Sequence, residues 1–186
     1  MGYRIFYSYQ SDIDKRLNIK FIREAINEAI SKITDYDIEP LIEGFYGIGG
    51  NPPLAEKMLQ QSQSSDIFIG DVTFTSSKVW HNPIDFVEGE KSNLIEIPKG
   101  DLKPSPNPNV LIETGFSWAL KGYDRTILVM NTAFGQPENL PIDMGDKRHP
   151  ITYNLSFDRF NIEAKKKKEG ESLCNSLYNA ILTVIK

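Results

Sequence analysis

The sequence predicts an α/β fold in which a parallel β-sheet is covered by helices on both faces. Short runs rich in aromatic and β-branched residues, typical of buried strands, alternate with segments whose apolar residues recur every three or four positions, typical of amphipathic helices. This alternation is the pattern of strand–helix–strand crossovers, which build parallel sheets. No internal repeat is visible, so we expect a single domain over residues 1–186.

Nine elements are predicted along the chain. In order they are a strand over residues 3–9, a helix over 19–33, a weaker strand over 37–42, a helix that opens at Pro52 and Pro53, a strand over 65–72, a helix over 108–121, a strand over 125–130, a short strand over 151–153 and a helix over 162–186. Five parallel strands suggest a flavodoxin-like three-layer sandwich with strand order 2-1-3-4-5. Ligands of such sheets bind beyond the carboxyl ends of the strands, at the switch point between the first and third.

Two loops are candidates for ligand binding. The connection over residues 73–107 is long, polar and proline-bearing, so it is expected to be a lid or a binding loop. The glycines between residues 44 and 50 could cradle a phosphate. Their spacing matches no known phosphate-binding loop, and a plain surface loop is the simpler interpretation.

The helix over residues 108–121 has strong end signals. Asn107 is a favourable N-cap, Pro108 suits the first helical position, and Gly122 can close the far end. Nearly every residue between these ends is apolar or small, so the helix is expected to be buried on most sides. Glu113 is the only ionisable residue from Asn107 to Leu120.

Glu113 is therefore the central candidate for a functional residue. A carboxylate in an apolar setting is costly unless it is paired, hydrogen-bonded or open to a cleft. Asn109 and Ser117 lie one turn before and after Glu113 and share its face of the helix. The side chains of this polar stripe are expected to face an active site at the carboxyl ends of the strands. The alternative is a structural ion pair of Glu113 with Lys121 or Arg125.

Composition narrows the class of protein. The formal net charge of −4 argues against a nucleic-acid partner. No run of eighteen apolar residues exists and the first residues lead directly into a strand, so neither a membrane span nor a signal peptide is expected. Cys174 is the only cysteine, which fits a reducing cytoplasm. With His81 and His149 as the only histidines, a zinc site is not expected.

Three segments resemble those of TIR domains and their relatives. Residues 6–9 (FYSY) resemble the first strand of TIR domains. Residues 65–72 (SDIFIGDV) resemble the third strand of bacterial TIR-like proteins and of nucleoside 2-deoxyribosyltransferases, and residues 108–116 (PNVLIETGF) are similar to the helix that carries the essential glutamate in both groups. The resemblance covers residues 3–153. It looks closest to the TIR-like proteins of bacterial antiphage defence, of the Thoeris type or associated with bacterial STING.

The resemblance implies an NAD glycohydrolase or an ADP-ribosyl cyclase-like enzyme. NAD would be a substrate, cleaved between nicotinamide and ribose, with no separate cofactor and no metal. The product would be an ADP-ribose-derived signalling nucleotide that a separate effector protein reads. The resemblance also implies a homo-oligomer or a phage-derived trigger for activity. The loop over residues 73–107 and the C-terminal helix depart from a typical TIR domain.

One carboxylate can suffice for this reaction, because nicotinamide leaves as a neutral molecule and needs no general acid. The transition state is oxocarbenium-like, and Glu113 would stabilise its developing positive charge. Ser8 and Tyr9, at the end of the first strand, could contact ribose or phosphate, although a turn hydroxyl is an equal alternative. Asp71 could bind a ribose hydroxyl, order the following loop or cap a turn. Asn109 could orient Glu113 or bond the backbone near the helix start.

Two other functions remain open from the sequence. In a nucleoside 2-deoxyribosyltransferase, Glu113 would attack the sugar covalently as a nucleophile. In a non-catalytic TIR-like interaction module, the helices would bind a partner protein and Glu113 would have no chemical role.

Overall fold

The computed structural model describes residues 2–39, 42–43, 60–75, 104–141, 144, 149–157 and 162–186. The predicted helix that opens at Pro52 and Pro53, the glycine loop and most of the connection over residues 73–107 lie outside this described part. Residues 60–64, immediately before the third strand, are helical.

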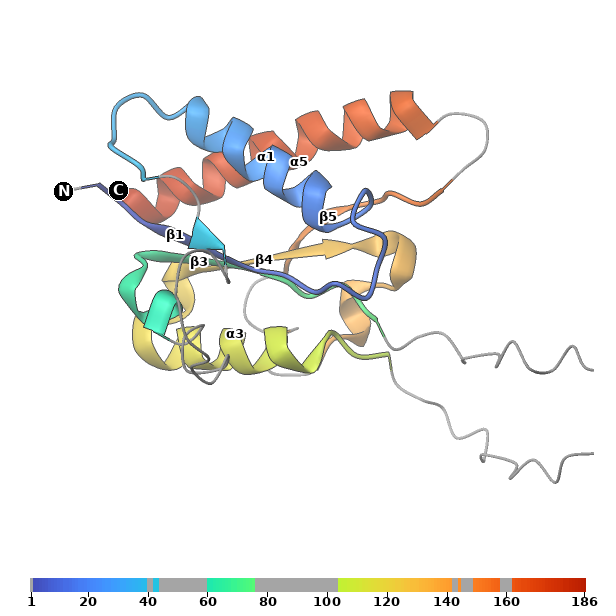
Figure 1. Ribbon diagram of the computed structural model, residues 1–186, viewed down its shortest axis with the longest axis horizontal. Helices are drawn as coiled ribbons and strands as arrows, with labels where there is room; N and C mark the ends of the chain where they lie inside the picture. The colour runs from blue at the N-terminus through green and yellow to red at the C-terminus, as the bar shows by residue number, and fades with distance from the viewer. Residues whose placement is uncertain are drawn as a thin grey trace, which may run out of the picture.

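One parallel sheet runs through the domain. Its strands are β1 (Ile5–Ser8), β2 (Ile42–Glu43), β3 (Ile67–Asp71), β4 (Thr126–Asn131) and β5 (Ile151–Tyr153), in the spatial order β2-β1-β3-β4-β5 (Figure 1). Each pair of neighbours is parallel, and the register sets Ser8 beside Gly70. The predicted α/β class with a parallel sheet is therefore confirmed. The weaker strand predicted over residues 37–42 is represented by a bridge between Tyr3 and Ile38 and by the two residues of β2.

Helices cover both faces of this sheet. Helix α1 (Ile19–Ser31) and helix α5 (Ile162–Ile185) lie side by side on one face, and helix α3 (Pro108–Lys121) lies on the other (Figure 1). Three short 3-10 helices complete the described connections: η2 (Tyr123–Arg125), η3 (Thr132–Phe134) and η4 (Pro137–Asn139). Within the described ranges no helix has the length and apolarity needed to cross a lipid bilayer.

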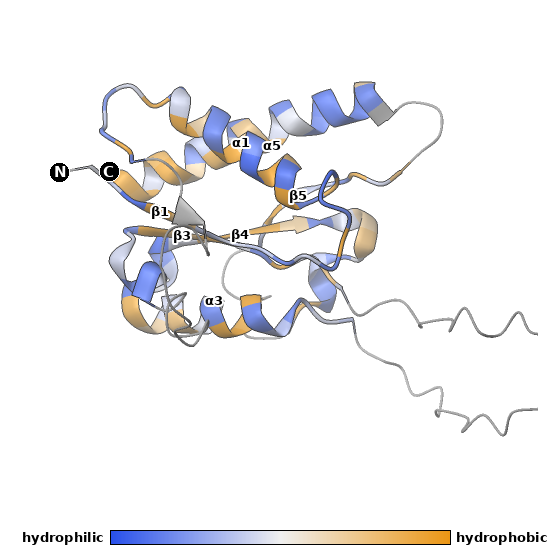
Figure 2. Cartoon of the chain, in the orientation of Figure 1, coloured by the Kyte–Doolittle hydropathy of each residue, from blue (hydrophilic) through white to orange (hydrophobic). Residues whose placement is uncertain are grey.

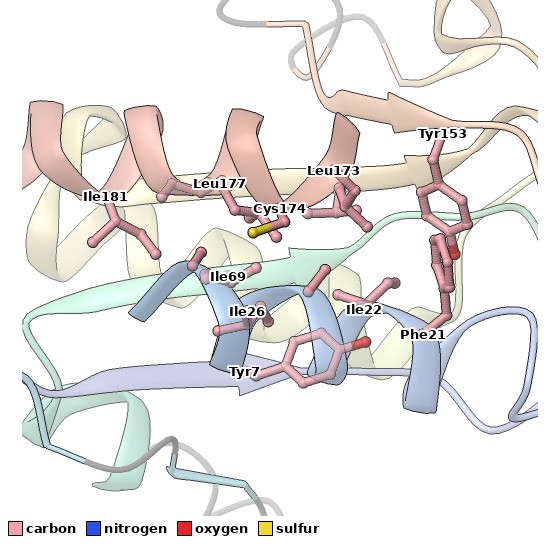
Figure 3. Close-up of a cluster of buried hydrophobic side chains, with 14 of the residues drawn as sticks. Tyr7, Phe21, Ile22, Ile26, Ile69, Tyr153, Leu173, Cys174, Leu177 and Ile181 are labelled. Carbon is pink, nitrogen blue, oxygen red and sulfur yellow. The ribbon is translucent and has the colours of Figure 1, made fainter. Parts of the chain in front are cut away.

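The larger apolar core lies between the sheet and the pair α1 and α5. Tyr7 of β1 and Ile69 of β3 meet the buried faces of both helices there, as Figure 3 shows. Hydrophilic residues interrupt the apolar ones along both helices, as expected when one helical face meets solvent (Figure 2). The predicted apolar face of α5 is confirmed at Leu173, Leu177 and Ile181, and its last buried member is Ile185; Val184 is half-buried.

Successive residues of β1 and β3 point to opposite faces of the sheet, so their even-numbered residues face α3. The rings of Phe6 and Phe68 pack there with centroids 5.9 Å apart. Ser8 and Gly70 follow them at the carboxyl ends of the two strands. Apolar contact with α3 is made by a smaller cluster that includes Val110 and Leu128. This side of the sheet is the one that can present residues to Glu113.

The ends of α3 are as predicted. The Asn107 side chain accepts a hydrogen bond from the Asn109 N–H at 2.9 Å, and Pro108 is the first helical residue. Gly122 has φ 78°, a conformation that favours glycine, and its N–H donates to Trp118 O at 3.0 Å. These contacts are local, which is why the sequence alone located both ends of the helix.

The expectation that α3 is buried on most sides is wrong. Ile112 is 65% exposed, and Leu120 is exposed as well. The buried residues are Val110, Glu113, Thr114 and Ser117. These face the sheet, and three of the four, Glu113, Thr114 and Ser117, are polar. The apolar outer face is exposed because α3 contacts the sheet along one narrow stripe.

Candidate active site around Glu113

Helix α3 places Glu113 against the carboxyl end of β1. The residue is 5% exposed, and Ser8, the last residue of β1, is buried beside it. Burial raises the pKa of Glu113, and the Ser8 hydroxyl next to the carboxyl counteracts part of that rise. Within the described part of the chain, Glu113 Oε2 and Ser8 Oγ are buried and neither has a hydrogen-bond partner of normal geometry. A buried carboxyl group and a buried hydroxyl whose mutual contact falls short of normal hydrogen-bond geometry are costly for folding, which makes this pair the strongest candidate for a site that meets a ligand.

The structural alternative for Glu113 was an ion pair with Lys121 or Arg125. Lys121 instead donates from Nζ to two backbone carbonyls, Gln63 O at 3.3 Å and Ser65 O. Arg125 is exposed in η2, beyond the C-terminal end of α3. The ion pairs recorded among the described residues do not include Glu113. Its carboxylate is therefore not explained by a structural salt bridge with either residue.

A glycine brings α3 close to the sheet at this point. A Cβ atom at Gly70 would lie 2.9 Å from Phe68 Cε1 and 3.2 Å from Thr114 Oγ1. Thr114 follows Glu113 in α3, so the missing side chain of Gly70 sets how closely the catalytic candidate approaches β1 and β3. Gly70 and Thr114 were not among the predicted site residues. A glycine inside a strand is itself a signal of such a close approach.

We expect Gly70→Ala to lower the free energy of unfolding by about 1–3 kcal/mol, because the added methyl group would push α3 from the sheet or force Phe68 to move. Gly115→Ala is the matched control. Its Cβ would meet no atom within 4 Å, and alanine is the better helix former, so a gain of about 0.5–1 kcal/mol is expected. Urea unfolding of both variants measures the difference. Equal effects of the two substitutions would show that the contact of Gly70 with Thr114 is unimportant.

Asp71 faces away from Glu113, into the layer of α1. Its carboxylate accepts hydrogen bonds from Asn18 Nδ2 at 2.8 Å, from Gln10 Nε2 at 3.3 Å and from the Thr73 N–H at 3.1 Å. Thr73 Oγ1 also donates to Asp71 and accepts from the Asn131 N–H at 2.9 Å. Burial raises the pKa of Asp71, and hydrogen bonds from Thr73, Asn18 and Gln10 oppose this rise. Of the three roles foreseen for Asp71, the geometry matches two: Asp71 caps the turn at Thr73 and orders the following segment.

The contacts recorded for the remaining predicted site residues are with other parts of the chain. Tyr9 packs its ring on Tyr7 with centroids 5.6 Å apart, at the edge of the larger core. Asn109 is exposed at the start of α3. Ser117 is buried, and its hydroxyl pairs with Thr126 Oγ1 at 3.1 Å.

Among the predicted residues, only Ser8 is brought to Glu113. The physical reason is the alternation of side chains in a strand. Asp71 follows Gly70 and so points to the opposite face of the sheet. Tyr9 shares the face of Tyr7, two residues earlier. Ser117 lies one turn farther along α3, over the beginning of β4.

Stability should depend on pH through Glu113. Burial holds its pKa above the ordinary value of 4.5. The folded state then binds the proton more tightly than the unfolded state. This contribution to stability is fully present below pH 4.5 and is lost as the pH rises through the folded-state pKa.

Accordingly, the wild type should lose stability relative to Glu113→Gln between pH 4.5 and neutral pH, by on the order of 1 kcal/mol. Urea unfolding of both proteins over this range checks the difference, and the subtraction removes the similar effect of Asp71. Parallel stability curves would contradict the inferred burial of an ionisable Glu113.

No group of three potential metal ligands among His, Cys, Asp and Glu side chains occurs in the described residues. A scan against protein-family models and a search of curated proteins each found no match to this chain.

Proposed function

We propose that this protein is a TIR-like enzyme that cleaves the bond between nicotinamide and ribose in NAD. The observation that carries the proposal is the state of Glu113. Its carboxylate is buried at the carboxyl end of β1, has an oxygen without a hydrogen-bond partner among the described residues, and lies beside the Ser8 hydroxyl. Such a group is costly for folding, and a role in chemistry is a reason for a protein to retain it.

The proposed step needs a negative charge close to the ribose. As the C1′–N1 bond breaks, its electron pair goes to the pyridinium nitrogen, and nicotinamide leaves as a neutral molecule. The positive charge that remains on the sugar is stabilised by the ionised Glu113, whose field is strong in a buried setting. Water or a hydroxyl group then adds to C1′ and gives up its proton to Glu113 or to solvent water. Ser8, which lies beside Glu113, would hydrogen-bond a ribose hydroxyl or the carboxylate itself.

The wider role follows the same resemblance. The product would be an ADP-ribose-derived signal, linear, cyclic or conjugated, that a separate effector protein reads in antiphage defence. The enzyme would act in the cytoplasm as a homo-oligomer, with activity that a phage-derived trigger raises. The exposed apolar face of α3, which includes Ile112 and Leu120, supports an assembly with another protein surface.

A nucleoside 2-deoxyribosyltransferase is the second candidate. The unpaired Oε2 of Glu113 supports it, because a nucleophilic carboxylate needs an oxygen that no donor occupies. Glu113 would then form a covalent bond with C1′ of the deoxyribose as the base leaves, and a second base would displace the carboxylate.

Parallel incubations separate these functions. Purified protein is supplied with NAD in one reaction and with a deoxynucleoside plus a different free base in the other, and products are identified by mass spectrometry. Release of nicotinamide from NAD alone is the expected result. Base exchange without NAD loss would replace the first proposal with the second. If neither reaction occurs at high protein concentration or in phage-infected lysate, the non-catalytic interaction module is favoured.

A further inference from the structure

A second cavity opens at the carboxyl edge of the sheet and does not include Glu113 or Ser8 among its described lining residues. It has a volume of about 620 Å³, within the range of small-molecule sites. Its walls come from the segments that follow β1, β3, β4 and β5. The described residues that line it are Asp12, Ile13, Asp14, Leu17, Phe74, Thr75, Ala133, Phe134, Ser156 and Phe157.

The cavity has an apolar and aromatic interior. Phe74 and Leu17 are buried, and Phe134 is half-buried against the larger core. Gly135 holds the neighbouring turn in place. It has φ 147°, and a Cβ at this position would lie 2.3 Å from Phe74 Cδ2. The chain therefore passes directly over the Phe74 ring, which fixes the position of Phe134 at the cavity wall.

The charges at this cavity are negative. Asp12 and Asp14 contribute carboxylates, and no lysine, arginine or histidine is present in the described lining. Arg16, outside the lining, neutralises Asp14: it donates from Nε at 3.0 Å and from Nη2 at 2.8 Å, and this pairing lowers the pKa of Asp14 to about 2. Asp12 accepts from the neutral Asn107 Nδ2 at 2.7 Å. Because Asn107 is neutral, this contact brings no positive charge to Asp12.

The fold already contains one planar cation stacked on an aromatic ring at this cavity. The Arg16 guanidinium lies over the Phe157 ring, 4.5 Å from its centroid, while its nitrogens bind the Asp14 carboxylate. A cation over a ring face is attracted by the negative charge of that face. Asp12 and Phe134 provide a second carboxylate and a second ring on the lining of the same cavity.

From these observations we infer that this cavity binds a small planar organic cation, with aromatic faces packing on the ligand and Asp12 accepting its hydrogen bonds. Phosphates and carboxylates are disfavoured, since they would meet the negative charge of Asp12 and no cationic partner among the described lining residues. Glu113 is not among the described lining residues, so the inference does not depend on whether the protein cleaves NAD.

Three probes of nearly the same shape test the charge preference. Benzamidine is a planar cation, benzamide is its neutral counterpart, and benzoate is the anion. Binding to the full chain is measured by titration with NMR detection of backbone amide shifts. We expect benzamidine to bind at least about fivefold more tightly than benzamide, and benzoate to bind most weakly. The shifts should be largest at Thr75, Ala133 and Phe134.

Variants assign the binding to the cavity. Asp12→Asn keeps an oxygen that can accept from Asn107, so the fold should be retained while benzamidine affinity falls about fivefold and benzamide affinity stays unchanged. Phe134→Leu should weaken both probes. Asp35→Asn, at an exposed position outside the cavity, is the matched control, and Glu113→Gln should leave benzamidine binding unchanged.

The outcomes decide the inference. Equal affinity for benzamidine and benzamide, or a preference that survives Asp12→Asn, would overturn it. Absence of benzamidine binding at millimolar concentrations would also overturn it. Loss of binding in Glu113→Gln with no effect of Asp12→Asn would place the cation at the proposed active site instead.

Discussion

Replacing Glu113 with glutamine is expected to lower the rate of nicotinamide release from NAD by at least about 100-fold. Glutamine keeps the size of the side chain but removes the negative charge that would stabilise the developing oxocarbenium ion. The charge acts in a buried setting at 5% exposure, where water cannot replace it. Release of nicotinamide is followed by chromatography and mass spectrometry at saturating NAD, and the loss should appear in kcat.

Glu138→Gln is the matched control, because Glu138 is exposed in η4 and the same change removes one charge from the surface. This control should retain full activity. The Glu113→Gln protein should also remain folded, and above pH 4.5 it should be at least as stable as the wild type, since the cost of ionising the buried carboxyl is gone. An active and folded Glu113→Gln protein would refute the proposed chemistry.

Replacing Asp71 with alanine is expected to lower the free energy of unfolding by about 3 kcal/mol or more. The substitution removes the acceptor for side-chain donors of Gln10, Asn18 and Thr73 and for the Thr73 N–H. A buried donor that loses its acceptor costs about 1–3 kcal/mol, and several donors are affected at once. The loss would be a large part of the total stability of an ordinary domain.

Urea unfolding with circular dichroism measures this loss, and Asp35→Ala, which removes an exposed carboxylate, should change stability by about 0.5 kcal/mol or less. Asp71→Asn is informative as well. It supplies one acceptor oxygen but directs an amide N–H₂ group at the remaining donors, so it should also destabilise. If Asp71→Ala is as stable as the control, Asp71 is not the organising acceptor of this network, and a direct ligand role would become the better explanation.

Much of the fold was predictable because it depends on local patterns. Asn107, Pro108 and Gly122 mark the ends of α3 through contacts within a few residues, and the structure has those ends. The run of β-branched and other apolar residues that forms β4 is recognisable in the same way. Glu113 was recognisable because a lone carboxylate in an apolar helix is costly to bury, so its presence calls for a specific role.

The surroundings of Glu113 were only partly predictable. Ser8, Tyr9 and Asp71 all lie at or next to the carboxyl end of a strand. From the sequence alone they were therefore predicted to share one site. A strand sends neighbouring residues to opposite faces, and only the register and packing show which face meets α3. Gly70 and Thr114 were missed because they matter only through the close approach of α3 to the sheet. No short sequence pattern reveals how closely a helix and a sheet pack.

By itself, the sequence determined the α/β class, most of the elements in the described part of the chain and the isolated carboxylate, because hydrophobic periodicity and capping act over a few residues. The tertiary structure alone decided that Ser8 meets Glu113, that Asp71 joins a buried network on the other face, and that α3 leaves Ile112 exposed. It also decided where the aromatic, acidic cavity forms. These outcomes depend on which faces of separate elements meet, and contacts between residues far apart in the chain set that choice.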